Sequence, residues 1–359
     1  MTTIPIRQVR PTHPARRLPA EWEAQSAVML TWPHRFGDWV EDLAAADTTF
    51  TAIAAAISAR EDLLITAADD DHRRHIETRL AAGGADCART RIAIAPSNDV
   101  FVRDHGPITV TDAAGPLLLN FRFNGWGGKY RHADDDALTR ALATQGVFGK
   151  TPVEDVDFVL EGGSIESDGE GTLLVTASCL LSPSRNPALS AGEIEQRLKA
   201  ELGADRVEWL HHGYLAGDDT DGHVDTLARF CDPRTIAYCQ CPDEGDEHYR
   251  ALRALEEELK ALRTAEGLPY RLMPLPWPAA KLNAEGERLP ATYANFLILN
   301  GAVLVPTYAD RADGEALRVL ATCFPNRTII GIDCLSLIAQ HGSLHCATMQ
   351  LPQGVGVPA

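Results

Sequence analysis

The sequence predicts an α/β protein built as one large domain, and three observations lead to this class. The chain has 359 residues, 45% of them hydrophobic, which is enough to bury a substantial core. Short apolar runs typical of buried strands alternate with longer amphipathic stretches typical of helices. Polar turn blocks recur roughly every 60 residues, as in a radial array of units that each contribute one turn to a shared centre. These blocks lie around Trp32, Asp104, Glu161, His223, residues 293–295 and Cys346.

In the first third of the chain, strands alternate with helices whose ends are marked in the sequence. We expect strands at 26–32, 62–67 and 91–95, helices at 42–60 and 70–82, and a hairpin that turns at 112–115. The second helix should stop at Gly83-Gly84, because glycine tolerates the left-handed backbone that ends a helix.

The rest of the chain repeats this alternation. Expected strands are 153–160, 172–176, 206–210, 224–230, 234–239, 295–299, 303–306, 328–332 and 343–350, and expected helices are 190–203, 247–265 and one that begins near 315. Ser190 and Glu193 form a capping box, and Gly203 closes that helix. We interpret the proline-rich loop at 274–290 as an excursion inside one domain, and no proline- or serine-rich linker marks a domain boundary. We therefore expect a loosely held tail at 1–17 and a single domain at 18–359.

Charge and hydropathy exclude several classes of partner. With 33 basic and 50 acidic residues, the net charge of −17 argues against nucleic acid and anionic membrane surfaces and weakly favours cationic ligands. The apolar run at 296–306 is too short to span a bilayer, and no secretory core follows the arginine-rich first residues. The eight cysteines contain no C-x-x-C pair, so we expect reduced thiols in a cytoplasmic protein.

Residues 217–226 hold the densest cluster of reactive side chains. Four aspartates and His223 lie just before or at the start of an apolar run that we expect to be a strand. On an extended strand, residues i and i+2 leave the same face, so His223 and Asp225 should point into one space. Taken alone, the pattern is equally typical of a strand start with a simple salt bridge.

Three further side chains lie where an apolar run meets a turn. Cys346 follows a glycine turn, where a histidine cation would lower the pKa of the thiol, although a core cysteine is the plainer alternative. Asp104 could be a surface aspartate paired with Arg103. Glu161 ends an apolar strand, and a carboxylate there needs a partner, which favours a functional role.

Common cofactor motifs are absent from the sequence. Gly149-Lys150-Thr151 lacks the upstream glycine of a P-loop, residues 162–166 lack the last glycine of a nucleophile elbow, and no G-x-G-x-x-G follows a strand. A metal-dependent hydrolase centred on His223 and Asp225 is a separate hypothesis, although one cysteine and scattered carboxylates form no clean ligand set. We therefore expect neither a cofactor nor a metal.

One thiol, one imidazole and three carboxylates suit a planar cation better than an amide. Amide hydrolysis requires oxyanion donors, whereas a guanidinium pairs with two carboxylates, and each charge-assisted contact contributes about 1.5–3 kcal/mol. Its central carbon then stays open to a thiolate at about 3–3.5 Å. The imidazole can protonate the departing ammonia and activate the water that hydrolyses the amidino-thioether.

Seven motifs follow one another between residues 18 and 352. They are Leu18-Pro-Ala-Glu-Trp-Glu23, Val102-Arg-Asp-His-Gly-Pro107, Asn124-Gly-Trp-Gly-Gly128, Leu160-Glu-Gly-Gly-Ser-Ile165, Ser184-Arg-Asn-Pro187, Asp219-Thr-Asp-Gly-His-Val-Asp225 and Leu344-His-Cys346. Together they resemble the agmatine deiminase family. That family belongs to the guanidino-group-modifying enzymes, which also include arginine and peptidylarginine deiminases.

The resemblance implies a five-bladed pseudosymmetric α/β propeller of the pentein type, with 18–359 as the catalytic domain. It also implies residue roles. Cys346 would be the nucleophile and His223 the general acid and base. Asp104 and Asp225 would hold the guanidinium, and Glu161 would steady the histidine.

The substrate end of the site carries the departures from the family pattern. Asp219 stands where the family usually has a glutamate near the far end of the substrate, and Trp126 is expected near the pocket. The family usually has tryptophan at Phe101, an aromatic or small residue at His105, and Gly-Gly-Gly-Asn at 340–343, where this chain has Gln-His-Gly-Ser. We expect these positions close to the aliphatic chain and amine of the substrate.

The leading hypothesis is a cofactor-free enzyme of polyamine metabolism and putrescine biosynthesis. It would convert agmatine, a small cationic guanidino compound, to N-carbamoylputrescine and ammonia through a covalent amidino-cysteine intermediate. The resemblance also suggests a homodimer. The alternatives are a deiminase of arginine or peptidyl arginine, and a non-catalytic relative that binds guanidines or polyamines.

Overall fold

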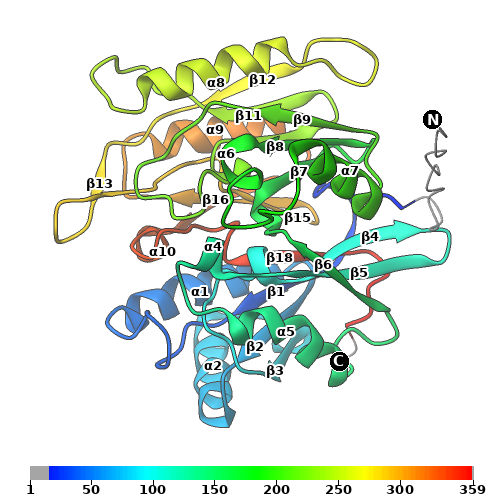
Figure 1. The fold of residues 1–359 in the computed structure, drawn as a ribbon. Coiled ribbons are helices and arrows are strands. Elements are labelled where there is room, and N and C mark those ends of the chain that lie inside the picture. Colours follow the sequence, from blue (N-terminus) through cyan, green and yellow to red (C-terminus); the bar gives the residue numbers. More distant parts are fainter. Residues whose placement is uncertain (1–15, 358–359) are drawn as a thin grey trace, which may run out of the picture.

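The computed structural model describes residues 16–357, which form small mixed sheets with helices packed around them (Figure 1). The predicted α/β class is confirmed. This part of the chain contains six sheets, five of them with three or four strands. The sixth is the hairpin of β13 (Lys281–Leu282) and β14 (Arg288–Leu289), which lies inside the loop predicted at 274–290.

The first sheet joins the two ends of the described chain. Its strands are β1 (Gln25–Thr31), β2 (Asp62–Ala67), β3 (Thr90–Ile94) and β18 (Thr348–Pro352), in the order β18-β1-β2-β3, with helices α1 (Leu43–Ser58) and α2 (Asp70–Gly83). β18 runs antiparallel to β1, with Met349 opposite Met29. The segment that carries Cys346, just before β18, is therefore held beside the first strand.

The other four large sheets repeat one pairing pattern, in which the first strand is antiparallel to the second and the second is parallel to the third. Their strands are β4 (Ile108–Asp112), β5 (Gly115–Arg122) and β6 (Val153–Val159); β7 (Ile165–Ser167), β8 (Thr172–Thr176) and β9 (Arg206–Leu210); β10 (Ala228–Asp232), β11 (Thr235–Cys239) and β12 (Arg271–Leu275); and β15 (Leu297–Leu299), β16 (Ala302–Thr307) and β17 (Thr328–Asp333). The longer connecting helices are α5 (Ala133–Thr144), α7 (Ala191–Leu202), α8 (Tyr249–Ala261) and α9 (Asp313–Cys323). Strands β18, β1 and β2 pair in the same way, so the pattern occurs five times among the described residues.

Helix ends lie where the capping signals predicted them. Ser190 caps α7 through a capping box with Glu193, and Gly203, at φ 70°, ends that helix. Helix α2 ends at Gly83, followed by Gly84 at φ 76°. Gly84 and Gly203 both adopt the left-handed backbone conformation, which costs other residues conformational energy.

Short turns precede the first strand of several sheets, and here the structure differs from the prediction. The short helical segments are η1 (Cys87–Arg89), α3 (Val102–His105), α4 (Gly125–Gly128), η2 (Gly162–Ser164), α6 (Ala177–Leu180), η3 (Val224–Thr226) and α10 (Leu335–Ile338). The strand predicted at 224–230 begins only at Ala228, and the strand predicted at 343–350 begins only at Thr348. A turn lets consecutive side chains face the interior, whereas a strand alternates them between two faces.

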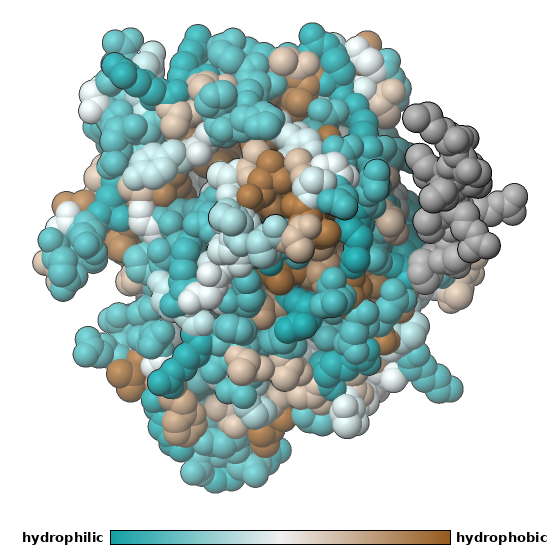
Figure 2. Space-filling view, viewed as in Figure 1, coloured by the Kyte–Doolittle hydropathy of each residue, from teal (hydrophilic) through white to brown (hydrophobic). Residues whose placement is uncertain are grey.

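Large aromatic side chains mark the core, and hydrophilic residues cover most of the face seen in Figure 2. Trp32, Phe50, Phe230 and Phe296 belong to one buried apolar cluster. Among residues 16–357, the structure has no helix with the length and apolar character needed to cross a membrane.

The start of the described chain is held by ion pairs. Arg16 pairs with Glu154 at 2.7 Å and with Glu201 at 3.0 Å, and Arg17 pairs with Glu23. Residues 1–15 of the predicted tail lie outside the described residues.

Candidate active site

One surface pocket gathers five of the predicted site residues: Cys346, Asp104, Trp126, Phe101 and Asp219. The remaining lining residues are Asp38, Asp99, Tyr130, Asp218, Thr220, Thr226, Gln340, His341 and Gly342. They come from turns far apart in the sequence, so the fold brings these side chains together.

The other three predicted residues, His223, Asp225 and Glu161, are fully buried beside the pocket residues. His223 Nδ1 lies 3.6 Å from Asp104 Oδ1, and His223 Nε2 lies 3.9 Å from Glu161 Oε2. Cys346 Sγ lies 3.7 Å from Asp225 Oδ2. All eight predicted residues therefore form one cluster, although His223 and Asp225 are placed by the turn η3 and not by the predicted strand.

Gly163 allows three of these groups to converge. A Cβ atom at this position would lie 2.7 Å from His223 Nδ1, 2.9 Å from Asp104 Oδ1 and 3.0 Å from Asp225 Oδ2. The Gly163 backbone N–H also donates a 2.9 Å hydrogen bond to Asp104 Oδ1. The site itself therefore requires glycine at this position.

Asp104 is buried, so the alternative of a surface aspartate paired with Arg103 is wrong. Its Oδ2 accepts a 2.9 Å hydrogen bond from Trp126 Nε1, in addition to the contact of Oδ1 with Gly163. Burial raises the pKa of Asp104, and the charge of His223 offsets part of this rise. Arg103 instead donates to Glu21 at 3.0 Å.

Glu161 has its partner in Arg185, a role that the sequence reasoning missed. Arg185 Nε donates to both Glu161 oxygens at 2.9 Å, and both side chains are fully buried. Burial favours the neutral acid, but His223 and Arg185 hold the pKa of Glu161 below its usual value. The available signal was the arginine of the motif 184–187 together with the need of a buried carboxylate for a cation.

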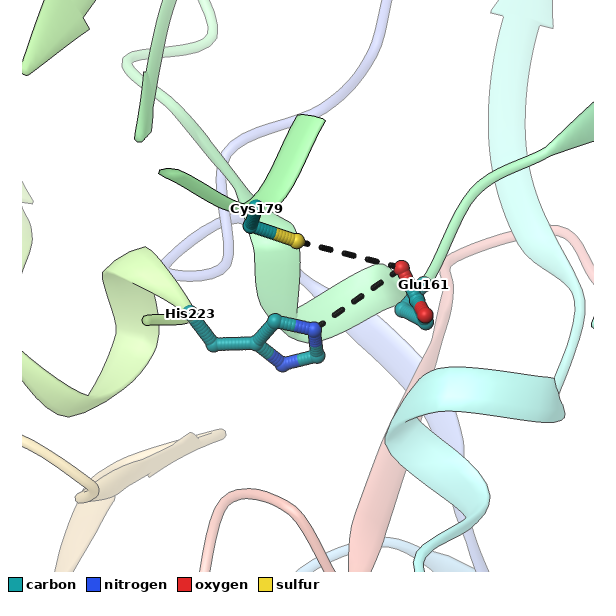
Figure 3. Close-up of side chains that lie close together, drawn as sticks. All are labelled: Glu161, Cys179 and His223. Carbon is teal, nitrogen blue, oxygen red and sulfur yellow. Dashed lines mark hydrogen bonds and ion pairs between the residues drawn. The ribbon is translucent and has the colours of Figure 1, made fainter. Parts of the chain in front are cut away.

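His223 lies among groups that stabilise its cation. Burial lowers the pKa of His223, but Asp104, Cys179 and Glu161 raise it by more, so the pKa lies well above its ordinary value. The Cys179 Sγ atom is 4.0 Å from Glu161 Oε2, and both side chains point toward the imidazole (Figure 3). Cys179 lies in a short apolar run, and no sequence pattern pointed to it.

Cys346 is buried, with 4% of the residue exposed. Burial raises the pKa of Cys346 well above its ordinary value, and the charges of Asp225 and Asp104 raise it further. Asn295 Nδ2 lies 3.3 Å from the sulfur. The expectation that a histidine cation lowers the pKa of this thiol is therefore wrong for the free protein, because burial and the two carboxylates raise that pKa.

Carboxylates also line the part of the pocket around Asp219. Asp219 Oδ2 accepts a 2.5 Å hydrogen bond from the Tyr130 hydroxyl and lies 3.7 Å from His341 Nδ1. Lys129 is not among the lining residues, and its ammonium donates to the Asp219 backbone oxygen and to the Asp221 carboxylate. Burial raises the pKa of a further lining carboxyl, that of Asp99, to about 6.

Most positions that depart from the family pattern line the pocket. Phe101 packs edge-on against Trp126, with 6.4 Å between ring centroids, and residues 340–342 complete the same wall. Gly342 is needed there, because a Cβ would lie 2.3 Å from the Phe101 ring. His105 is not among the lining residues. It is buried, with Nε2 4.0 Å from Asp135 Oδ1.

Two groups of residues in the described chain could each reach one metal ion: Glu161, Cys179 and His223, and Glu21, Glu166 and His345. In both groups a guanidinium already neutralises a carboxylate, from Arg185 in the first and from Arg229 in the second. Asp225 belongs to neither group. The hypothesis of a metal-dependent hydrolase centred on His223 and Asp225 therefore has no matching ligand set between residues 16 and 357.

Known proteins share this fold and sequence over nearly the whole chain. The sequence model of the family of Porphyromonas-type peptidyl-arginine deiminases matches residues 17–352. The agmatine deiminase of Stutzerimonas stutzeri strain A1501 is 36% identical, over 93% of this chain and 95% of the relative. A solved C. jejuni agmatine deiminase with a cysteine-to-serine substitution and bound substrate is 34% identical with a TM-score of 0.89, over 97% of this chain and 100% of that chain. A solved Porphyromonas gingivalis protein, provisionally described as an arginine deiminase, is 49% identical with a TM-score of 0.88, over 94% of this chain and 99% of that chain.

These matches confirm the resemblance found in the sequence motifs. The chain belongs to the Porphyromonas-type peptidyl-arginine deiminase family, and its relatives in these comparisons include agmatine deiminases.

The first testable prediction concerns Gly163. The substitution Gly163→Ala should lower kcat/KM for a guanidino substrate by about a hundredfold or more, because the new methyl group displaces an imidazole and two carboxylates at once. Gly192→Ala, at a position where a Cβ meets nothing within 4 Å, is the matched control and should retain full activity. Full activity of Gly163→Ala would show that these three groups do not act together.

Proposed function

We propose that this chain is an agmatine deiminase, a hydrolase that converts agmatine to N-carbamoylputrescine and ammonia. One observation carries the proposal: buried carboxylates and an imidazole converge beside a thiol and retain unused hydrogen-bonding atoms. His223 Nδ1, His223 Nε2 and Asp225 Oδ1 are buried without a hydrogen-bond partner among the described residues. Such atoms are costly unless a ligand meets them.

A guanidinium matches the carboxylates of this cluster in charge and shape. Its planar N–H groups suit two carboxylates approached from two sides, here Asp104 and Asp225. Asp104 is oriented by Trp126 and Gly163, so it presents a fixed acceptor. A bound cation would balance the negative charge that these two residues keep out of water.

Substrate binding then activates the nucleophile. Burial raises the pKa of Cys346 in the free protein, and the charges of Asp225 and Asp104 raise it further. A guanidinium bound between the two carboxylates cancels their part of this rise, so the thiol releases its proton to solvent and the thiolate forms more readily when the substrate is in place. The Cys346 sulfur attacks the central carbon and gives a tetrahedral adduct.

His223 moves the protons of both half-reactions. Its raised pKa keeps the imidazole protonated, so it can donate to the departing ammonia as the C–N bond breaks and the amidino-cysteine forms. The neutral imidazole then takes a proton from the water that attacks the same carbon. The C–S bond breaks, and the ureido product leaves the thiolate behind. Glu161, itself fixed by Arg185, steadies the imidazole during both transfers.

The charge of the pocket favours agmatine over the alternative substrates. The pocket that holds the proposed guanidinium site is also lined by the carboxylates of Asp219, Asp99 and Asp38. His341 is the single basic side chain among the lining residues. An ammonium at the far end of the substrate is attracted by this field, whereas the carboxylate of arginine is repelled. Peptidyl arginine would bring neutral backbone in place of that ammonium. A non-catalytic protein that binds guanidines or polyamines would need the carboxylates but would not need a thiol among the residues that line the pocket.

We extend the proposal to the architecture. The five sheets that share one pairing pattern are taken as the five blades of a pseudosymmetric propeller, within a single catalytic domain at 18–359. The enzyme is expected to act in the cytoplasm as a homodimer, without a cofactor, nucleic acid or membrane as partner.

The thiol is tested by substitution. Cys346→Ala should reduce ammonia release from agmatine to the uncatalysed background, because no other group can form the covalent intermediate. Cys87→Ala, which removes an exposed thiol, is the control and should leave the rate unchanged. Ammonia release at the normal rate by Cys346→Ala would contradict the mechanism.

The substrate is tested with a panel of agmatine, arginine and an arginyl peptide, with ammonia as the readout. We expect kcat/KM for agmatine to exceed that for arginine by about a hundredfold or more, because the lining carboxylates repel the substrate carboxylate. Asp219→Asn should narrow this ratio by weakening the attraction for the ammonium. If arginine or the peptide were hydrolysed with a kcat/KM equal to that of agmatine, the proposal that agmatine is the substrate would be contradicted.

A further inference from the structure

Immediate neighbours of the catalytic residues form a second charged layer that does not line the pocket. Arg103 precedes Asp104, and His345 precedes Cys346. Glu21, from the motif at 18–23, joins the same layer. The mechanism described above uses none of these three side chains. They are nevertheless linked to the site by a continuous chain of hydrogen bonds.

The central link is His345, which is fully buried between two carboxylates. Its Nδ1 lies 2.7 Å from Asp225 Oδ2, and its Nε2 lies 2.7 Å from Glu21 Oε1. A contact this short between a ring nitrogen and a carboxylate oxygen requires a hydrogen between them, because two facing lone pairs would repel each other. His345 thus contacts both carboxylates at hydrogen-bond distance, while burial and the charges of Arg103 and Arg229 lower its pKa.

This arrangement divides the two oxygens of Asp225 between protein and ligand. Oδ2 is held by His345 and by Asn295 Nδ2 at 3.2 Å, whereas Oδ1 has no hydrogen-bond partner in the described chain. Burial favours the neutral acid, but the hydrogen bond and charge of His345 hold the pKa of Asp225 below its usual value. One oxygen is thus fixed so that the other is free for a guanidinium.

Glu21 in turn fixes the imidazole ring. Arg103 Nη1 donates to Glu21 at 3.0 Å, Arg229 Nη2 at 2.5 Å and Gln350 Nε2 at 3.0 Å. Burial opposes ionisation, but His345, Arg229 and Arg103 hold the pKa of Glu21 well below its usual value. An ionised and immobile Glu21 keeps the His345 Nδ1–H directed at Asp225.

We propose that Glu21 and His345 are positioning residues, which hold Asp225 in the orientation and the ionised state that bind the guanidinium. The proposal rests on the proposed function, since it assumes that Asp225 contacts the substrate. Neither residue touches the reacting atoms. The charged or titratable groups around His345 are Glu21, Asp225, Arg103, Arg229 and Glu166, and those around Asp225 are His345, His223, Asp104, Cys346 and Arg229.

The experiment measures agmatine affinity against pH by calorimetry, with every variant built on Cys346→Ala so that binding is separated from turnover. His345→Leu removes the donor to Asp225, and we expect affinity to fall by about tenfold or more, the size of one charge-assisted hydrogen bond. The pKa of Asp225 should also rise, because its ionised form loses a donor. Affinity, which needs the carboxylate, should then be lost at a higher pH than in the parent.

Three further variants separate positioning from structural damage. His345→Gln keeps an N–H donor and should recover most of the affinity. Glu21→Gln removes the carboxylate that fixes the His345 ring. The pH below which affinity is lost (the acid limit) should rise in this variant too, but by less than in His345→Leu. Glu23→Gln is the matched control, because Glu23 lies in the same segment but pairs with Arg17, and it should bind like the parent.

A folded His345→Leu variant with parental affinity and an unchanged acid limit would overturn the proposal. If that variant does not fold, as judged by its melting curve, Glu21→Gln decides by the same two readouts, and parental behaviour there overturns the proposal. Failure of the proposed function looks different. In that case the parent itself does not bind agmatine, and the unmodified protein releases no ammonia from it.

Discussion

The burial of negative charge around one imidazole is the constraint on which the rest of the site depends. Glu161 and Asp225 are fully buried, and leaving such a group without its partner costs about 3–5 kcal/mol. Arg185 balances Glu161, His345 contacts Asp225, and His223 lies among the acids as a cation. The remaining negative charge lies beside a protonated thiol. This excess of negative charge supports the proposed binding of a cationic ligand and, together with burial, raises the pKa of the Cys346 thiol.

The repeated strand pairing explains how side chains so distant in sequence reach one place. Each of the five large sheets contributes one polar residue from the turn before its first strand. These residues are Asp104 before β4, Glu161 before β7, Asp225 before β10, Asn295 before β15 and Cys346 before β18. At two of these turns the preceding residue is Arg103 or His345, and it joins the charged layer that does not line the pocket. The turns that carry Asp104 and Cys346 thus each supply one group to the pocket and one to its support, and a single insertion in either turn would disturb both layers.

Much of the fold and most of the pocket could be predicted from the sequence, because both leave local patterns. Strand and helix periodicity gave the α/β class, and glycines marked the helix ends. Seven of the eight site residues that the structure brings together lie in the motifs, and the eighth, Phe101, directly precedes one of them. The pairing of Glu161 with Arg185, the placement of Cys179 and the raised thiol pKa could not be predicted, since each depends on neighbours from other sheets. The strand expected after Gly222 was wrong for a related reason: burial of His223 and Asp225 requires a turn, and alternation alone does not reveal it.

Thiol alkylation tests the central claim directly. The measurement compares the rates at which a cationic haloacetamidine and a neutral haloacetamide of similar size modify Cys346, with modification of that residue verified by mass spectrometry. If buried carboxylates both admit a planar cation and suppress the free thiolate, the cationic reagent should react at least about tenfold faster, and Asp104→Asn should remove most of that advantage. Equal rates for the two reagents, or an advantage that survives in Asp104→Asn, would contradict this account.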